Sequence, residues 1–517
     1  MRLKAFSLLI MAIPLLSFGG TQLMFHSPDL AEPHYKICFS FDSPADTTFF
    51  ESLSLNGEPF DQFIILQAGN KQDNASPLKK GETTFWLDYV WKNKTKYKVI
   101  LNYKLGQTGK KKKASYSATS PEKGGLSIAN PLFHRVFIVE ETAGLARENE
   151  LVYLTFTVPE KLLAAEKLVL FDGDTSLPFQ IIDQHTSVPP EKVRHSHPIT
   201  NTIKLAAQLD IEPGEKKLLL LMEGNDFRQA SAGFEINGEG LGKTVKNDQL
   251  SLEFHPQSGQ INIIENVKEG IKLWNEIGVI HWNPGCYIPG VAWDHSFDWN
   301  PPDTLEEISG NLLYLNSRRG LLPHIKEIFL EVKYALTRNA PYFIVETKMN
   351  LQQNLGTVAL RNDEMVLYSK LFDSLVYQNQ TGECVQLPLK EIPGRPFGIV
   401  HVAPDNLDWV GLLNTEKQFG FFCVRINYVN MNLDAPGDFL NQQGTYFYAP
   451  AGGKYAYWVR PLYYTWAKHL TSNHFTYAPA GSIFYEKNAY IILPLTPGYA
   501  QTLNNLLAQL RNPLWVH

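Results

Sequence analysis

Short apolar runs separated by polar breaks set the pattern of the N-terminal part of the chain. Four of these runs have the length and composition of β-strands, at residues 35–40, 63–66, 84–90 and 97–103. Turn signals lie between them, at Asn56-Gly57 and Ala68-Gly69. The pattern predicts an immunoglobulin-like β-sandwich over residues 30–120. The lysine run at 110–113 is interpreted as part of a solvated linker.

The same strand-and-turn pattern continues almost to the end of the chain. Residues 130–240 alternate as a small β module, and residues 250–495 suit one large two-sheet sandwich. This large domain opens with a predicted hairpin, in which the turn Gln257-Ser258-Gly259 joins strands at 250–254 and 260–264. Helical spacing is clear only near the end, in the apolar stripe of Tyr499, Leu503, Leu506, Leu507 and Leu510. The sequence therefore predicts an all-β protein with a short C-terminal helix, its third domain spanning residues 245–517.

The first 22 residues have the pattern of a signal peptide. Arg2 and Lys4 precede a short apolar run at 5–18, and small residues follow at Ser17 and Gly19. This segment predicts a secreted or periplasmic protein. No later segment approaches the ~18 consecutive apolar residues that a membrane-spanning helix needs, so no span is expected in the mature chain.

Charge and cysteine usage narrow the class of protein further. The formal net charge of -5 gives no reason to expect a nucleic-acid partner. Cys38, Cys286, Cys384 and Cys423 form no CxxC pair, which argues against a zinc ribbon, and their spacing does not choose disulfide partners. Aromatic residues make up 12% of the chain, which fits strand-rich domains and also the flat platforms of sugar-binding clefts.

Several short motifs resemble modules of bacterial carbohydrate-active proteins. GLARENELV (144–152), LVLF (168–171) and LPFQ (177–180) resemble a β module that precedes a larger β domain in such proteins. SLEFHPQSGQINIIE (251–265), LEVKYALTRNAPYF (330–343) and VALRNDEMVLY (358–368) resemble the galactose-mutarotase-like supersandwich. Both modules occur in this order in exo-acting rhamnogalacturonan lyase-like proteins. The helical toroid that many relatives carry has no counterpart here.

The resemblance implies a polysaccharide lyase that cleaves a uronic-acid-containing glycan by β-elimination. Such a reaction needs a group that neutralises the sugar carboxylate, a base for the C5 proton, and an acid for the leaving oxygen. A polysaccharide or oligosaccharide is the expected partner. No cofactor is evident in the sequence, although a divalent cation such as calcium is compatible with this chemistry.

Residues suited to these roles occur in four clusters. Trp293 or Trp299 could stack on a sugar ring, with His295 or Asp298 meeting its hydroxyls; the alternative is an ordered loop capping the sandwich. Arg319 suits carboxylate recognition and His324 could act as a base, or both could belong to an exposed basic turn.

The third cluster is Arg361-Asn362-Asp363-Glu364. Arg361 or Asn362 could neutralise a uronate, with Glu364 orienting Arg361; alternatively, Asn362-Asp363 is an ordinary turn pair.

The fourth cluster lies on late strands and contains His401, Tyr428, Arg460 and Tyr463. Regular alternation would place Tyr428 on the face opposite Arg425. The hypothesis assigns catalytic roles to His324, Arg361, His401 and Tyr428. It assigns substrate binding to Trp293, His295, Trp299, Arg319, Asn362, Arg460 and Tyr463, and no residue to a metal.

Two other functions fit the same sequence. A non-catalytic carbohydrate-binding protein would show aromatic side chains without a clustered base, and a structural module of the envelope would show no such cleft. Within the enzyme class, a glycoside hydrolase would need two carboxylates, and Asp294, Asp298, Glu364 and Asp373 could supply them.

Overall fold

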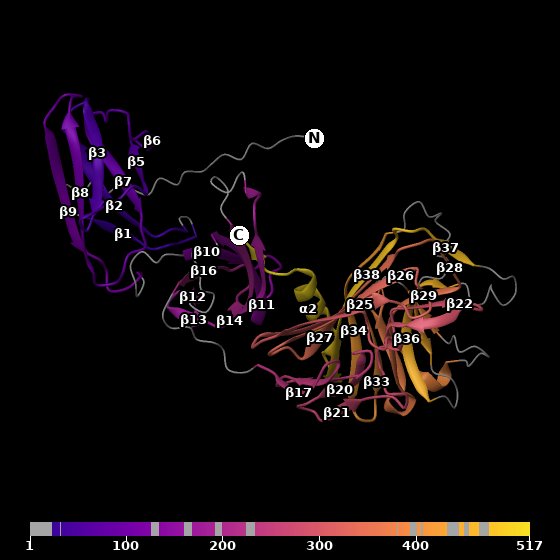
Figure 1. Cartoon of the computed structure of the whole chain (residues 1–517). Helices are drawn as coiled ribbons and strands as arrows, with labels where there is room; N and C mark the ends of the chain where they lie inside the picture. The colour runs from indigo at the N-terminus through magenta and orange to yellow at the C-terminus, as the bar shows by residue number, and fades with distance from the viewer. Residues whose placement is uncertain are drawn as a thin grey trace. The chain divides into compact units, whose positions relative to one another are not determined.

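The structure is a computed structural model (Figure 1) and describes residues 23–30, 33–125, 134–159, 168–191, 199–223, 233–379, 381–392, 401–404, 407–431, 444–448, 454–464 and 475–517. Residues 1–22, the predicted signal peptide, lie outside these ranges, so export stays a prediction. The described residues are mostly β-strands, with one α-helix near the C-terminus, which confirms the predicted all-β class. The chain forms two compact units, and each is described by itself.

Unit 1 comprises Met1–Ile138, Leu162–Gly173 and Leu218–Phe227. Its strands, indigo to violet in Figure 1, form two antiparallel sheets. One sheet contains β1 (Met24–His26), β2 (Lys36–Ser43), β7 (Gly81–Asp88), β5 (Phe63–Gln67) and β6 (Asn70–Gln72), in that order. The other contains β4 (Glu58–Pro59), β3 (Thr48–Leu55), β8 (Lys96–Leu105) and β9 (Lys111–Thr119). Alternate residues of both sheets, such as Phe39, Phe85 and Val99, fill a common core, so the unit is a β-sandwich.

Three more strands contribute to the core of unit 1. Strand β12 (Leu168–Asp172) pairs with β16 (Lys216–Glu223), and Leu220 and Met222 of β16 are buried in the core of the sandwich. Val136 of β10 (His134–Glu140) packs against the same core.

The lysine run is a strand rather than a linker, so that interpretation was wrong. Lys111, Lys112 and Lys113 begin β9 and pair with β8, and Lys111 Nζ lies 3.6 Å from Glu51 Oε2. Strand β9 lies at the edge of its sheet and buries only one of its side chains, Tyr116. An edge strand tolerates exposed lysines, and they discourage pairing with other chains. A charged run therefore did not reveal its secondary structure.

Unit 2 comprises Val139–Lys161, Asp174–Lys217 and Arg228–His517. One of its two smaller sheets has the order β11 (Arg147–Pro159), β15 (Thr200–Ile211) and β14 (Phe179–Ser187). The other has the order β17 (Glu235–Glu239), β18 (Gly242–Lys246), β19 (Leu250–Phe254), β20 (Ile261–Asn266) and β21 (Ile271–Leu273). Strands β19 and β20 form the predicted hairpin. Strand β39 (Trp515–Val516) pairs with the end of β10, and β13 (Thr175–Leu177) also belongs to this unit.

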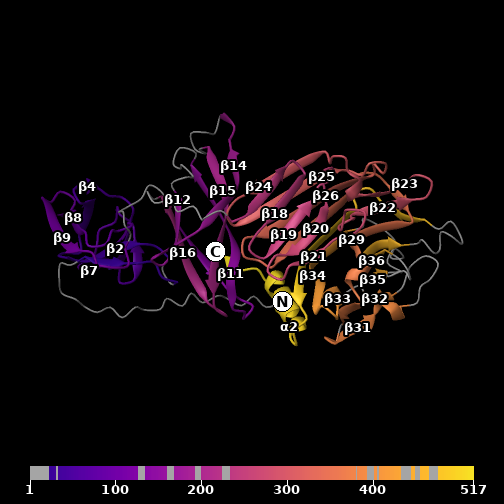
Figure 2. The same ribbon diagram turned by 90° about the horizontal axis from the view of Figure 1, so that it is seen from below.

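Two large antiparallel sheets dominate unit 2 (Figure 2). The six-stranded sheet has the order β23 (Ala292–His295), β22 (Gly285–Ile288), β29 (Ala359–Tyr368), β36 (Tyr455–Tyr464), β35 (Thr445–Tyr448) and β32 (His401–Ala403). The nine-stranded sheet has the order β24 (Thr304–Ser309), β25 (Leu313–Leu321), β26 (Ile328–Thr337), β27 (Tyr342–Leu351), β38 (Ile483–Pro494), β34 (Phe419–Met431), β33 (Trp409–Asn414), β30 (Ser374–Gln378) and β31 (Cys384–Pro388). Strands β28 (Leu355–Thr357) and β37 (Thr476–Ala478) make a small pair. Single 3₁₀ turns lie at η4 (Ser296–Asp298), η5 (Ser369–Leu371) and η6 (Leu389–Glu391).

The main core lies between the two large sheets. Leu330 and Phe421 of the nine-stranded sheet and Met365 and Trp458 of the six-stranded sheet belong to one buried cluster. Along β26 every second side chain is buried, as the period of a strand requires. The predicted two-sheet sandwich is therefore present in this part of the chain.

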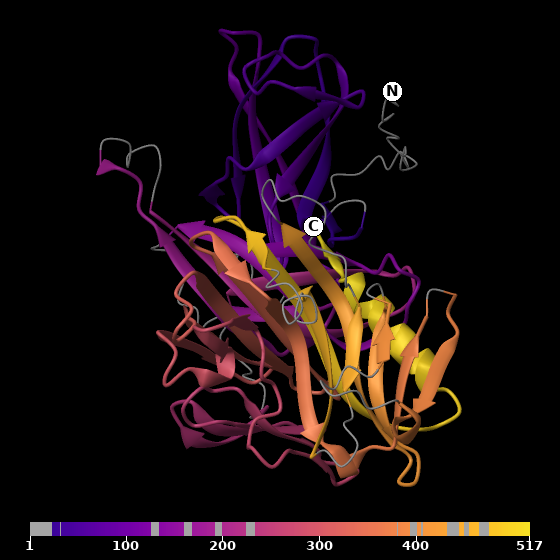
Figure 3. The same ribbon diagram turned by 90° about the vertical axis from the view of Figure 1, so that its right-hand side faces the viewer.

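The C-terminal helix α2 (Tyr499–Arg511), yellow in Figure 3, covers the other face of the nine-stranded sheet. Leu503, Leu506 and Leu507 pack with side chains of β33, β34 and β38, which confirms the apolar face predicted from their spacing. Arg147 of β11 also holds the helix, because it donates to the carbonyl oxygens of Gln509 at 3.3 Å and Asn512 at 2.6 Å. Arginine near a helix C-terminus satisfies carbonyl groups that the helix leaves open.

All four cysteines are free thiols, with Cys384 exposed and the other three buried. In the described residues, no helix combines the length and the apolar character needed to cross a membrane.

Candidate functional site

A β-bulge in β29 brings two charged side chains together. Asn362 pairs with Arg460 and Met365 with Trp458, so Asp363 and Glu364 stand opposite a single residue of β36. Asp363 takes the left-handed conformation with φ 45°, which Asp adopts more readily than most residues. In a regular strand, residues three apart point to opposite faces; the extra residue places Arg361 and Glu364 on the same face.

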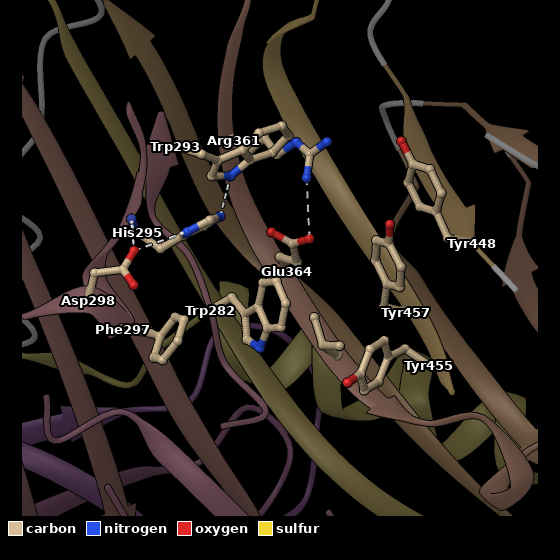
Figure 4. A pocket seen from close by; sticks show the side chains of 11 residues that line it. Trp282, Trp293, His295, Phe297, Asp298, Arg361, Glu364, Tyr448, Tyr455 and Tyr457 are labelled. Atoms are coloured by element: carbon tan, nitrogen blue, oxygen red, sulfur yellow. Dashed lines mark hydrogen bonds and ion pairs between the residues drawn. The ribbon is translucent and has the colours of Figure 1, made fainter. Parts of the chain in front are cut away.

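Arg361 and Glu364 line a cavity of about 490 Å³ on the face of the six-stranded sheet that lies away from the main core. Trp293 and His295 of β23 and Phe297 and Asp298 of η4 come from one edge of this sheet (Figure 4). Three tyrosines come from the neighbouring strands of its other half: Tyr448 of β35 and Tyr455 and Tyr457 of β36. Trp282 and Val366 complete the lining. The charged pair therefore lies between a wall of Trp and Phe rings and a wall of tyrosines.

A chain of contacts runs from Asp298 to Arg361. The Asp298 carboxylate accepts a hydrogen bond from the His295 backbone at 2.8 Å and lies 3.3 Å from His295 Nδ1. The indole N–H of Trp293 donates to His295 Nε2. An indole can only donate, so Nε2 must accept and the ring proton sits on Nδ1, facing Asp298. The guanidinium carbon of Arg361 lies 4.5 Å from the Trp293 ring centre. His295 thus holds the ring against which Arg361 is stacked.

Glu364 is the buried carboxyl group of the cavity, with 2% of the residue exposed. Its Oε1 lies 3.4 Å from Arg361 Nη1. Its Oε2 makes no hydrogen bond with a described residue, although the Asn283 amide is near enough to favour the charged form. Burial raises the pKa of Glu364, while Arg361, the Asn283 amide and the protonated form of His295 oppose that rise. A carboxyl group with a raised pKa can hold a proton for transfer inside the cavity.

Three of the predicted site residues meet in this cavity: Trp293, His295 and Arg361. Their neighbours in sequence do not. Asn362 points to the side of the main core, where its amide exchanges hydrogen bonds of 2.8 and 3.0 Å with the Thr347 hydroxyl. Trp299 is buried in the main core and donates from its indole to the Leu321 carbonyl at 2.8 Å.

Arg319 and His324 are not part of the cavity lining. Arg319 forms ion pairs with Glu306 at 3.1 Å and Glu331 at 2.9 Å on the nine-stranded sheet. The His324 side chain is 71% exposed, and its Nδ1 lies 2.9 Å from Asp294 Oδ1.

His401 lies on the edge strand of the six-stranded sheet, apart from the cavity lining, where its Nε2 is 3.1 Å from the Tyr377 hydroxyl. Burial lowers the pKa of His401.

Tyr428 and Arg460 form a separate contact on the core side of the sheets. The Arg460 guanidinium carbon lies 4.0 Å from the Tyr428 ring centre, and Arg460 also pairs with buried Glu486 at 3.2 Å. Regular alternation predicted Tyr428 on the face opposite Arg425, which was wrong. A bulge between Arg425 and Asn427 shifts the register, so that Tyr428 pairs with Glu486 and shares the face of Arg425. The Tyr463 side chain lies outside the described residues.

A buried polar network surrounds the bulge on the same core side. Asp363 Oδ1 accepts hydrogen bonds from the Tyr490 hydroxyl at 2.6 Å and the Trp458 indole at 3.2 Å. Its Oδ2 lies 3.6 Å from Arg425 Nη2. Each partner fixes the carboxylate of the residue that shapes the bulge, so the network positions Arg361 and Glu364 on the opposite face.

The tyrosine wall was missed from the sequence. Tyr455 and Tyr457 alternate with the core residues Ala456 and Trp458, so period-2 spacing was present, but either set could have faced the core.

Of the carboxylates considered for hydrolysis, the structure brings Asp298 and Glu364 into one cavity. Asp294 binds His324 instead, and Asp373 accepts from Thr415. In the described part of the chain, no group of three or more His, Cys, Asp or Glu side chains could hold a metal ion.

Comparison with known proteins identifies fold likenesses only. No family model matches the chain, and no curated protein matches it. An α-mannosidase from Enterococcus faecalis V583 matches with a TM-score of 0.44 and 10% identity, covering 75% of this chain and 46% of that one, so the chain spans about half its length. A galactose mutarotase-like protein from Lactobacillus casei ATCC 334 matches with a TM-score of 0.30 and 10% identity, covering 50% and 100%. At these values the likenesses assign neither family nor activity.

Proposed function

We propose that this protein is a carbohydrate-active enzyme that cleaves a uronic-acid-containing glycan by β-elimination. The observation that carries the proposal is the pairing of Arg361 with a buried Glu364 between two aromatic walls. Aromatic rings offer flat apolar faces for a sugar ring, and the hydroxyl groups of tyrosines add hydrogen-bonding partners.

Each step of elimination has a suitable group in the cavity. Arg361 would pair with the sugar carboxylate and stabilise the negative charge that develops when C5 loses its proton. Tyr455 or Tyr457 of the tyrosine wall, once its hydroxyl proton has been released to solvent, would take the C5 proton as a phenolate base. The C5–H electrons form the C4=C5 double bond while the C4–O bond breaks, and Glu364 gives its proton to the leaving oxygen. The raised pKa of Glu364 suits it to the role of acid.

A hydrolase is the second proposal, because two carboxyl groups line the same cavity. Glu364 is buried, whereas the Asp298 side chain is 33% exposed. Two carboxyl groups in different environments are the usual requirement for glycoside hydrolysis. The engagement of Asp298 with His295 favours a positioning role for it, and therefore favours elimination.

One product assay separates these functions. The purified mature protein is incubated with a panel of uronate and neutral polysaccharides, with calcium and with a chelator. Rising ultraviolet absorbance, which reports the unsaturated uronate, would support elimination. New reducing ends without absorbance would support hydrolysis. Binding with neither product would overturn both enzyme proposals in favour of a non-catalytic carbohydrate-binding protein. Glu364→Gln, which keeps the size of the side chain but has no acidic proton to transfer, is the matched control.

We also propose that the chain is exported, on the composition of residues 1–22. Expression in a bacterial host should yield a periplasmic or secreted protein that lacks this segment, measured as intact mass. A full-length mass in the cytoplasmic fraction would contradict export.

A further inference from the structure

The Arg361–Glu364 pair occupies the place where a charged ligand would bind. Both residues line the cavity, and their facing atoms are 3.4 Å apart. Among the described residues of the lining, Arg361 is the one Lys or Arg side chain. A ligand carboxylate that binds Arg361 through Nη1 would therefore compete with Glu364 for that nitrogen.

The surroundings of Glu364 determine the outcome of this competition. Arg361 on its own strand favours the ionised form of Glu364, as do the Asn283 amide before β22 and, when its ring is protonated, His295 from β23. Asp363, next to it in β29, favours the protonated form. Asp298, Tyr448, Tyr455 and Tyr457 are the other ionisable groups in the lining. A second anion beside Arg361 would draw away the largest stabilising charge and add repulsion, and burial of Glu364 leaves both effects weakly screened.

We propose that a sugar carboxylate replaces Glu364 as the partner of Arg361, and that Glu364 takes up one proton from solvent as the ligand binds. The ligand class is a glycan end that bears a carboxylate, and its identification as a sugar rests on the proposed function. The exchange is balanced: a carboxylate plus a proton gives a carboxylic acid, and no bond of the ligand changes. The proton gained is the one that Glu364 would deliver to the leaving oxygen.

Proton uptake on binding fixes the direction in which the affinity changes with pH. A complex that holds one more proton than the free protein binds more tightly as pH falls, by about tenfold per pH unit at most. The effect spans the interval between the pKa of Glu364 in the free protein and its higher pKa in the complex. At pH values below that interval Glu364 is already protonated in the free protein, and the affinity for the ligand no longer changes with pH.

Titration calorimetry of the full chain tests the proposal with glucuronate and galacturonate as probes and glucose and galactose as matched neutral controls. Runs from pH 5 to 8, in buffers of different ionisation enthalpy, give the number of protons taken up. The expected result is an uptake approaching one proton for the acidic sugars and none for the neutral ones. Glu364→Gln should bind the acidic sugars with no uptake and a flat pH profile, while Arg361→Gln should lose their binding.

Uptake that persists in Glu364→Gln would assign the proton to another group, such as His295, and would overturn the proposal. Acidic sugars that bind without uptake, or bind no better than neutral sugars, would also overturn it. This result is independent of catalysis. Proton-linked binding with no glycan cleaved removes the enzyme proposal alone, whereas cleavage without proton-linked binding removes the proton-uptake proposal alone.

Discussion

The guanidinium group of Arg361 lies against the indole ring of Trp293, 4.5 Å from its centre, and the two come from strands that are not neighbours in sequence. Glu364 approaches the same guanidinium group from its own strand at 3.4 Å. The arginine that would meet a ligand is thus held on two sides by groups whose own positions are fixed. A preorganised cation loses little freedom when it binds an anion.

Trp293→Phe should weaken the binding of acidic sugars by about threefold to tenfold, because it retains a ring beneath Arg361 but removes the indole N–H that binds His295. Trp293→Ala, which also removes the ring, should weaken it more. A double-mutant cycle with His295→Ala, measured by calorimetry, checks the mechanism. In the Trp293→Phe background, His295→Ala should have little further effect, because its partner is already gone. Independent, additive effects would show that His295 does not act through Trp293.

Arg361→Gln should reduce glycan cleavage by at least about a hundredfold, since about 3 kcal/mol of charge stabilisation is the usual loss for such a group. By contrast, His324→Ala and His401→Ala should stay within about twofold of the wild type, because neither side chain lines the cavity. Values of kcat/KM give the comparison, because Arg361→Gln is also expected to bind the substrate weakly. A large loss in His324→Ala or His401→Ala, with the fold intact by circular dichroism, would place the reaction elsewhere.

Asp363→Ala should destabilise unit 2 by about 3–5 kcal/mol, because it leaves the buried Arg425 charge and the Tyr490 hydroxyl without this carboxylate. Asp363→Asn should cost less, since Asn tolerates positive φ and can still accept a hydrogen bond. Urea denaturation followed by tryptophan fluorescence measures both. Equal stabilities for the Ala and Asn variants would mean that the carboxylate network does not support the bulge.

Glu141 should make unit 2 sensitive to acid. Burial alone raises its pKa, but hydrogen bonds from the Gly214, Ala143 and Gly144 backbones and from Arg147 outweigh burial and lower the pKa to about 2. A carboxyl group whose folded pKa is lowered stabilises the fold above its unfolded pKa, and that stability is lost as pH falls towards the folded value.

Glu141→Gln should therefore cost about 3 kcal/mol at neutral pH. The difference from the wild type should shrink between the ordinary value of 4.5 and about 2. Denaturation midpoints measured across this pH range provide the test. A difference that does not change with pH would contradict the assignment.

Elements in which apolar residues recur at a constant spacing were predictable from the sequence. Positions where a bulge interrupts that spacing were not. The stripe of Leu503, Leu506 and Leu507 gave the helix and its buried face, because spacing alone decides both. Tyr428 was placed on the wrong face because one unpaired residue in β34 reverses the face to which each later side chain of the strand points.

The candidate site depends on the same kind of interruption. Arg361 and Glu364 are recognisable as a charged pair, but their common face exists only through the bulge at Asp363. That bulge is stabilised by Tyr490 and Trp458, which come from strands more than ninety residues further along the chain. Local sequence carries no signal for such a partner, so the face of each residue could not be derived from alternation.

The hydrogen bonds of Arg147 to the end of the C-terminal helix have a consequence for folding during synthesis. Its partners, the carbonyl groups of Gln509 and Asn512, follow it by 362 and 365 residues. A ribosome releases the chain from its N-terminus, so this contact cannot form until Asn512 has been synthesised. Closing so long a loop is also slow. If the chain is exported as proposed, this late contact would leave the helix unattached to β11 while a translocation channel still needs an unfolded polypeptide.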